Sequence, residues 1–317
     1  MTTKIIINDM KKTIAIITLL LTVSMSAFAQ EDTFEINGVE YHITSNNTVE
    51  VTGSAWFGGS ELIIPEKVTC SGKEYTVTGI SDGVFPNNEN ITYVRIPATV
   101  KTIGNEAFDY CKNLTSCTFE GQSKLKEIGN YAFLATGLTT IDIPANVETI
   151  GYFSFAYNPA LQQVYMHSNN PSGYSSNAFD DCGDAVIYVP VESYETYKNQ
   201  FPNNKVEVPL DIFKPYALNT IEDGLNALNT LSDEDREDVN QYLSDITTAV
   251  TFDAAYVPFT LAMSIINDQS NFEKNLKTAL GSMATKQNGP AVEIVGADGT
   301  TIRLYNIEKV RYIKVNE

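Results

Sequence analysis

Apolar residues recur through the middle of the chain in a pattern that repeats every 22 to 25 residues. Short segments such as Ile91–Pro97, Leu114–Glu120 and Leu138–Pro144 alternate apolar and polar positions, as short strands with one buried face do. Each segment is followed by a phrase that closes on a phenylalanine, in the series Phe85, Phe108, Phe133, Phe155 and Phe179. A period of this length predicts a solenoid, in which each unit buries its apolar face against its neighbours.

Each position of one unit has a physical interpretation. In Ile141–Ile143 the two isoleucines face the core and Asp142 faces outward, because alternate strand residues point to opposite sides. Pro144 ends the strand, since it has no N–H for a further ladder bond. Gly151 is interpreted as a turn that needs a permissive backbone. Phe155 is expected to stack between the phenylalanines of the two neighbouring units, where its burial stabilises the fold by roughly 1.5–3 kcal/mol.

The phrase L-x-x-I-x-I-P-x-x-V-x-x-I-G-x-x-A-F-x-x-C, read from these units, resembles the leucine-rich repeat of BspA-like surface proteins of anaerobic bacteria. The resemblance covers about residues 34–208, and Tyr194–Phe201 is similar to that family's terminal cap. Two units depart from the pattern, with Phe119-Glu120 in place of Ile-Pro and Asn177-Ala178 in place of Ile-Gly. The resemblance implies attachment to host matrix proteins or to other bacteria.

The predicted fold class is α+β and mainly β: a leucine-rich-repeat solenoid with a β N-terminal cap, followed by a small helical module that ends in a β-hairpin. The predicted segments are a signal peptide (1–29), the N-terminal β cap (30–60), the solenoid with its C-terminal cap (61–209), a helical segment (210–288) and a β-hairpin tail (289–317).

The N-terminal segment has the features of a secretory leader. Lys11-Lys12 precede the apolar run Ile14–Met25, and Ala27–Ala29 forms a small-x-small cleavage motif. Either Met1 or Met10 is the start. We therefore expect secretion to the cell surface, the extracellular space or the periplasm, with no membrane span in the mature chain.

The β cap is expected between the leader and the first unit. Phe34–Thr52 is predicted to form two strands that join at Ser45–Asn47 and cover the first coil. The aromatic pair Trp56-Phe57 is expected to pack beneath them.

Beyond Val208 the apolar period becomes that of helices. Leu218, Ile221, Leu225 and Leu228 recur at spacings of 3, 4 and 3. Ser232 and Asp235 form a weak capping box that opens a second helix, whose apolar residues extend to Val250.

The rest of this segment predicts two more helices and a hairpin. The helices are expected over Ala254–Asn267 and Phe272–Met283, with Gly289-Pro290 as the stop. Two strands around Asp298-Gly299 predict the hairpin, followed by a segment from Val310 to Val315.

Four cysteines, Cys70, Cys111, Cys117 and Cys182, follow the leader. An even number in a secreted chain is compatible with disulfides. The repeat alignment instead places all but Cys70 at core positions, where a free cysteine behaves as a small apolar residue. We expect free thiols, and a disulfide remains the alternative.

Composition argues against nucleic acid and against catalysis. The net charge is −18, which repels a phosphate backbone. His42 and His167 are 125 residues apart, and no CxxC, P-loop, GxGxxG or GxSxG motif occurs. The carboxylates of Asp233–Asp238 are interpreted as a solvated helix start. We expect no enzyme, no cofactor and no metal site.

The solenoid surface is the candidate site. Two outward rows are predicted on the strands: Ile63, Arg95, Thr118, Asp142, Tyr165 and Tyr188 in the first, and Tyr93, Ser116, Thr140 and Gln163 in the second. The candidate ligand-binding residues are Tyr93, Arg95, Asp142, Gln163, Tyr165 and Tyr188. They predict a face for a protein partner from host matrix or a bacterial surface. A glycan-binding accessory module that uses the same tyrosines is the alternative, and a strand preference of aromatics explains them without any ligand.

Overall fold

The computed structural model describes residues 32–54, 57–229, 231–284, 291–295 and 301–305. The chain divides into two compact units. The first extends to Tyr188 and includes Glu195–Val206, and the second consists of Val189–Tyr194 and the chain from Glu207 onward. The predicted leader, residues 1–29, lies outside the described residues.

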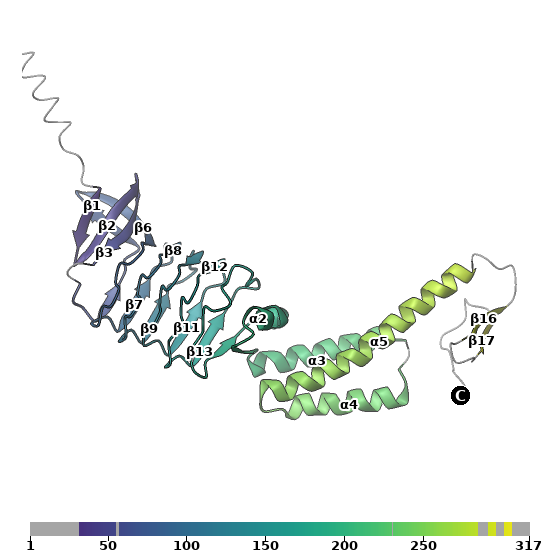
Figure 1. Cartoon of the computed structure of the whole chain (residues 1–317). Coiled ribbons are helices and arrows are strands. Elements are labelled where there is room, and N and C mark those ends of the chain that lie inside the picture. Colours follow the sequence, from purple (N-terminus) through teal and green to yellow (C-terminus); the bar gives the residue numbers. More distant parts are fainter. Residues whose placement is uncertain (1–31, 55–56, 230, 285–290, 296–300, 306–317) are drawn as a thin grey trace, which may run out of the picture. The chain divides into compact units, whose positions relative to one another are not determined.

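The first unit begins with a β cap of three strands (Figure 1): β1 (Thr33–Ile36), β2 (Val39–Ser45) and β3 (Thr48–Gly53). The predicted pair of strands joined at Ser45–Asn47 is present as β2 and β3, and β1 is an additional strand, because Asn37 and Gly38 both adopt positive φ and turn the chain between β1 and β2. Strand β3 then pairs in parallel with the solenoid, so the cap continues one of its sheets. Phe57 packs edge-on against Phe85, with 6.3 Å between ring centroids, and Trp56 lies outside the described residues.

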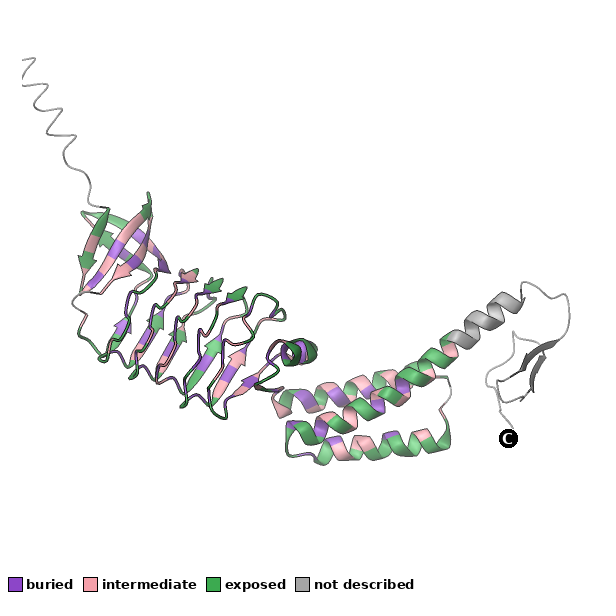
Figure 2. Cartoon of the chain, viewed as in Figure 1, coloured by how far each residue is buried: buried purple, intermediate pink, exposed green. Residues whose placement is uncertain are grey.

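Two sheets run along the solenoid. The sheet that continues the cap contains β6 (Lys73–Ile80), β8 (Thr102–Ile103), β10 (Glu127–Ile128) and β12 (Thr149–Ile150), with β5 (Lys67–Cys70) paired to β6. The other, here called the repeat sheet, has the order β15 (Lys205–Glu207), β14 (Val186–Tyr188), β13 (Gln163–Met166), β11 (Thr140–Ile143), β9 (Ser116–Phe119), β7 (Tyr93–Ile96) and β4 (Glu61–Ile63). Figure 2 shows buried residues alternating with exposed or intermediate ones along these strands, which is the predicted period of two.

The phenylalanine ladder fills the middle of the coils, as the sequence predicts. The five rings from Phe85 to Phe179 are at most 1% exposed. Successive centroids lie 5.3, 5.1, 5.2 and 5.1 Å apart with interplanar angles of 13° or less. Phe57 at one end and Phe201 at the other pack edge-on against the stack.

Glycine is required in the Ile-Gly phrase for a different reason from the predicted one. None of Gly104, Gly129 and Gly151 has a positive φ. A Cβ at Gly129 would lie 2.6 Å from the backbone nitrogen of Asn105 in the preceding coil, and the other two positions are equally tight. These glycines are required because adjacent coils approach closely, not because the turn needs a permissive backbone.

The cysteines are free thiols, as the repeat alignment predicts. Cys111, Cys117 and Cys182 are buried, and Cys70 is half-buried. The Cys111 thiol donates to the carbonyl of Phe85 at 3.0 Å, and Cys182 donates in the same way to Phe155 at 3.1 Å. Burial raises the pKa of each of these two thiols to about 11, so they remain protonated at neutral pH.

The predicted closing segment of the solenoid is present as α2 (Tyr194–Gln200). Within the first unit, Tyr197 and Phe201 are fully buried. The Tyr197 hydroxyl donates to the carbonyl of Ser168 at 2.8 Å, and the Phe201 ring contacts Phe179. This segment therefore covers the last coil.

In its described residues, the second unit contains three helices after the short 3-10 helix η1 (Val191–Ser193): α3 (Leu210–Ala227), α4 (Asp233–Thr248) and α5 (Phe252–Ala284). The predicted cap of α4 is confirmed, because Ser232 Oγ accepts from the Asp235 N–H at 3.0 Å. Leu228 and Val250 were wrongly assigned to helices: Leu228 is extended at the end of α3, and Val250 follows α4 and is 86% exposed.

The third and fourth predicted helices are one helix, α5. The polar run Asn267–Asn271, where the two predicted helices meet, contains neither glycine nor proline and remains helical. The hairpin is confirmed by β16 (Ala291–Val295) and β17 (Thr301–Tyr305), which pair antiparallel. The Gly289-Pro290 stop, the Asp298-Gly299 turn and the segment from Val310 lie outside the described residues.

Candidate functional site

The outward rows of the repeat sheet occupy the positions that the sequence predicts. Backbone pairing in the first row places Arg95 opposite Thr118, Asp142 opposite Tyr165, and Tyr165 opposite Tyr188. In the second row, Tyr93 lies opposite Ser116, Ser116 opposite Thr140, and Thr140 opposite Gln163. On β7, β11 and β13, buried residues flank each first-row residue on both sides and each second-row residue on one side, so the rows stand on a packed core.

Neighbouring coils interact through these side chains at the β7 end of the rows. The Tyr93 and Thr118 hydroxyls lie 2.8 Å apart and share a hydrogen bond. Arg95 Nη1 forms an ion pair with Glu120 Oε1 at 2.9 Å, with both side chains more than 40% exposed. An exposed pair of this kind contributes about 0–1 kcal/mol. The ion pair therefore adds little to the stability of the fold, and its main effect is to position the Arg95 guanidinium.

A second polar contact joins β11 to the residue after β13. His167 Nε2 lies 2.6 Å from Asp142 Oδ1, and their side chains are 55% and 69% exposed. Glu120 and His167 occupy the same repeat position, directly after the strand, where Pro97 and Pro144 stand in the other coils. Each reaches back to a first-row residue one coil earlier, at a separation of 25 residues.

Aromatic side chains form the β14 end of the first row. The Tyr165 and Tyr188 rings stack with centroids 5.2 Å apart and an interplanar angle of 20°. Both residues are half-exposed. The pair thus presents a single aromatic block, with one face of each ring covered by the other.

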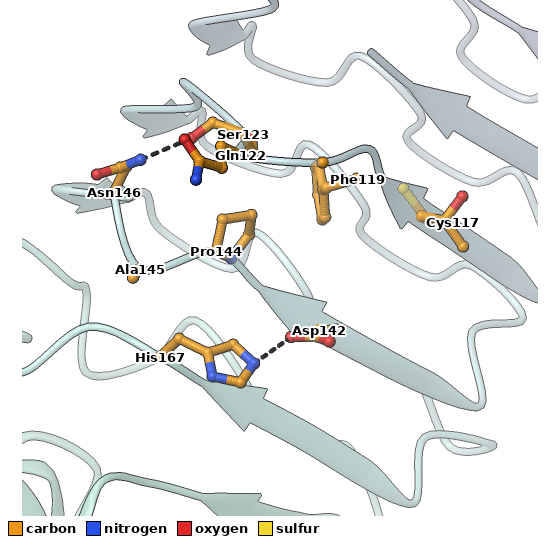
Figure 3. Close-up of a pocket in the computed structure, with 11 residues that line it drawn as sticks. Cys117, Phe119, Gln122, Ser123, Asp142, Pro144, Ala145, Asn146 and His167 are labelled. Carbon is orange, nitrogen blue, oxygen red and sulfur yellow. Dashed lines mark hydrogen bonds and ion pairs between the residues drawn. The ribbon is translucent and has the colours of Figure 1, made fainter. Parts of the chain in front are cut away.

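A groove of about 680 Å³ lies beside the rows, where β9, β11 and β13 end. Its lining includes the outward residues Thr118 and Asp142 together with Phe119, Gln122 and His167. In Figure 3, Pro144 lies between the Asp142–His167 pair and the group formed by Gln122, Ser123 and Asn146. Ligand pockets are typically about 300–1,000 Å³, so the groove has room for a small molecule.

The described residues contain neither a cluster of metal ligands nor a helix that could span a membrane. Among them, no three His, Cys, Asp or Glu side chains gather as a metal site requires. His42 lies on β2 of the cap, far along the chain from His167. None of the helices in the described part of the chain is long and apolar enough to cross a membrane.

The groove was not predicted from the sequence, and no role at the site was assigned to Phe119, Glu120 or His167. The available signal was their position, because each replaces the isoleucine or proline of the regular unit. A substitution that breaks a repeat at the end of a strand is where a side chain can leave the core or reach the preceding coil.

Comparison with known proteins agrees with this architecture. The BspA type leucine rich repeat region matches residues 78–207 in 6 copies. Among curated proteins, none matches the sequence.

Three solved structures illustrate the similarity. A leucine-rich repeat protein from Bacteroides capillosus is 32% identical over 43% of this chain and 99% of that one, with a TM-score of 0.38. The T. pallidum leucine rich repeat protein is 24% identical over 50% of this chain and 72% of that one (TM-score 0.43). The pneumococcal vaccine antigen PcpA is 23% identical over 50% of this chain, which spans 41% of that antigen's length (TM-score 0.37). Through its repeat region, the chain belongs to the BspA-type leucine-rich repeat family.

Proposed function

We propose that this protein is a secreted or cell-surface, non-catalytic adhesion module that binds a protein partner through the outward rows of the repeat sheet. The predicted leader supports secretion, and the family supports a role in protein interaction. The observation that carries the proposal is the Tyr165–Tyr188 stack, which stands on a packed core at the end of a row that also presents Arg95. Tyrosine and arginine are the residue types that dominate binding hot spots.

Pre-organisation favours this surface. Arg95 is paired with Glu120, Tyr93 is bonded to Thr118, and the two tyrosines support each other. Binding therefore immobilises few side chains that were free beforehand, which lowers its entropic cost. Asp142 and Gln163 stand between these anchors and supply polar contacts.

The glycan alternative on the same tyrosines is less well supported. A sugar ring stacks on an open aromatic face, whereas Tyr165 and Tyr188 each cover one face of the other at 5.2 Å. The stack is better suited to the apolar surface of a folded protein.

The test uses purified matrix proteins, namely collagen, fibronectin and laminin, together with whole bacterial cells, as immobilised probes for the protein. At least one probe should bind. The double variant Tyr165→Ser with Tyr188→Ser should weaken that binding at least tenfold, which corresponds to about 1.4 kcal/mol. Its melting temperature should remain close to that of the parent, because neither side chain belongs to the buried core.

A control variant separates this face from the rest of the surface. Tyr152→Ser removes an exposed tyrosine (61% exposed) that lies outside both rows, and it should bind as the parent does. Affinity that survives the double variant but disappears on removal of residues 210–317 would assign binding to the C-terminal part and contradict the proposal.

A further inference from the structure

Two departures from the regular repeat, Phe119 and His167, lie together in the groove beside β9, β11 and β13. In regular coils the last strand residue is fully buried, as Ile96 and Ile143 are. Phe119 occupies that position in β9 and is half-exposed, and it lines the groove. His167, in the proline position of its coil, lines the groove as well. The presence of two such substitutions in one groove marks a local specialisation.

The loop after Phe119 is also longer than its counterparts. Val100 and Val147 follow the last strand residue by four positions, whereas Leu125 follows Phe119 by six. Gly121 provides the turn with a φ of +50°. The two additional residues enlarge the wall of the groove at Gln122 and Ser123.

Hydrogen bonds to both neighbouring coils hold this loop in place. Asn146 Nδ2 donates to the Ser123 carbonyl at 2.7 Å from the following coil. The Lys124 N–H donates to the Ala98 carbonyl at 3.0 Å in the preceding one. Ser123 Oγ accepts from the Leu125 N–H at 3.2 Å. The wall is therefore formed before any ligand arrives, which lowers the cost of binding.

The groove presents an aromatic ring and polar groups with unused bonding capacity. Phe119 forms no ring pair with another aromatic among the described residues. In the same part of the chain, the Gln122 amide has no hydrogen-bond partner, and Asp142 uses only Oδ1, for His167. A carboxylate oxygen accepts, an amide both donates and accepts, and an imidazole does either according to its tautomer.

We propose that this groove binds a neutral saccharide, with the Phe119 ring as the stacking platform and with Asp142, Gln122 and His167 bonding its hydroxyl groups. A hydroxyl donates and accepts at once, so a ring of hydroxyls matches a mixed set of acceptors and donors. The site lies outside the face proposed for the protein partner except for Thr118 and Asp142, and it does not depend on that proposal.

Other ligand classes fit less well. An anion would meet the Asp142 carboxylate in a protein of net charge −18. A metal ion would need several hard ligands, and the described residues contain no such cluster. A large apolar group would cover Phe119, Pro144 and Ala145, but it would leave the polar groups of Gln122, Asp142 and His167 in the same lining without hydrogen-bond partners.

The experiment is saturation-transfer NMR on the purified protein with the methyl glycosides of glucose, galactose, mannose and N-acetylglucosamine as probes. At least one should give saturation transfer, with a dissociation constant in the millimolar range or below. Phe119→Ile should weaken binding at least tenfold and preserve the fold, because isoleucine is the residue that other units carry in this position. Gln122→Ala should weaken it at least threefold.

Two controls make the result decisive. Gln162→Ala removes an exposed amide outside the groove and should leave saccharide binding unchanged. The absence of saturation transfer from all four probes at 10 mM would overturn the proposal. Binding that persists in Phe119→Ile but is lost in the Tyr165→Ser, Tyr188→Ser double variant would move the saccharide to the tyrosine stack and would equally overturn it.

Discussion

Truncation of one ring in the phenylalanine ladder tests the energetics of the fold. Phe133 is fully buried at the centre of the stack, with Phe108 at 5.1 Å on one side and Phe155 at 5.2 Å on the other. Phe133→Ala removes one ring that takes part in two stacks. The backbone bonds of residue 133, from its N–H to Ser154 and from Asn158 to its carbonyl, do not involve the side chain and remain.

The expected loss is about 3–5 kcal/mol, the usual cost of a buried aromatic truncation. A residual cavity on the order of 100 Å³, at about 24 cal/mol per Å³, accounts for roughly 2.4 kcal/mol of this. Two lost aromatic pairs contribute about 0.5–1.5 kcal/mol each. Because both neighbours are themselves packed on further rings, the site has little freedom to collapse, which favours the upper half of the range.

Urea denaturation followed by far-UV circular dichroism measures the loss. Tyr152→Ala is the matched control, because it truncates a ring that is 61% exposed and should cost about 0.5 kcal/mol or less. A loss below about 1 kcal/mol in Phe133→Ala would refute the ladder as the main source of stability, since it would fall below any buried aromatic truncation.

Three further changes probe other features. A thiol reagent should modify four cysteines in unfolded, unreduced protein, and two or no reactive groups there would reveal a disulfide. In the folded protein only Cys70 should react rapidly, because burial raises the pKa of Cys111, Cys117 and Cys182. Gly129→Ala should lower the free energy of unfolding by about 1–3 kcal/mol through overpacking against the Asn105 backbone. Gly58→Ala, with no atom within 4 Å of the new Cβ, should leave it unchanged. Equal effects of the two variants would contradict the close-approach argument. Burial, and secondarily Glu106, raises the pKa of Asp109. This carboxyl therefore favours folding below its unfolded pKa, and that contribution is lost as pH rises through the folded pKa. Asp109→Ala should raise the melting temperature at pH 7, and the gain should vanish near pH 3.

Much of the first unit could be predicted because a fixed period converts a residue number into a place in the coil. Once Phe108 and Phe133 are aligned, the positions of Arg95, Asp142 and Tyr165 on the outward rows follow. The same logic identified Cys111 and Cys182 as core residues, and the structure confirms both.

What could not be predicted depends on contacts between coils and on the length of helices. The pairs of Glu120 and His167 require side chains to reach across to the previous coil, which a one-dimensional pattern does not encode. The continuity of α5 through Asn267–Asn271 was missed. A polar run alone does not end a helix, which stops only where water or a helix-breaking residue replaces its backbone hydrogen bonds. Loop length carried the clue to the groove, in the two additional residues before Leu125.

The edge-on rings at both ends of the ladder determine how this array can grow. Phe57 and Phe201 turn their edges toward the stack, so neither offers a flat face on which another parallel ring could sit. A repeat unit added outside Phe57 or Phe201 could therefore not continue the parallel stack of rings. A unit duplicated between Phe108 and Phe133 would instead insert one more ring at the existing spacing and leave both closures intact. The array can change its length only from within.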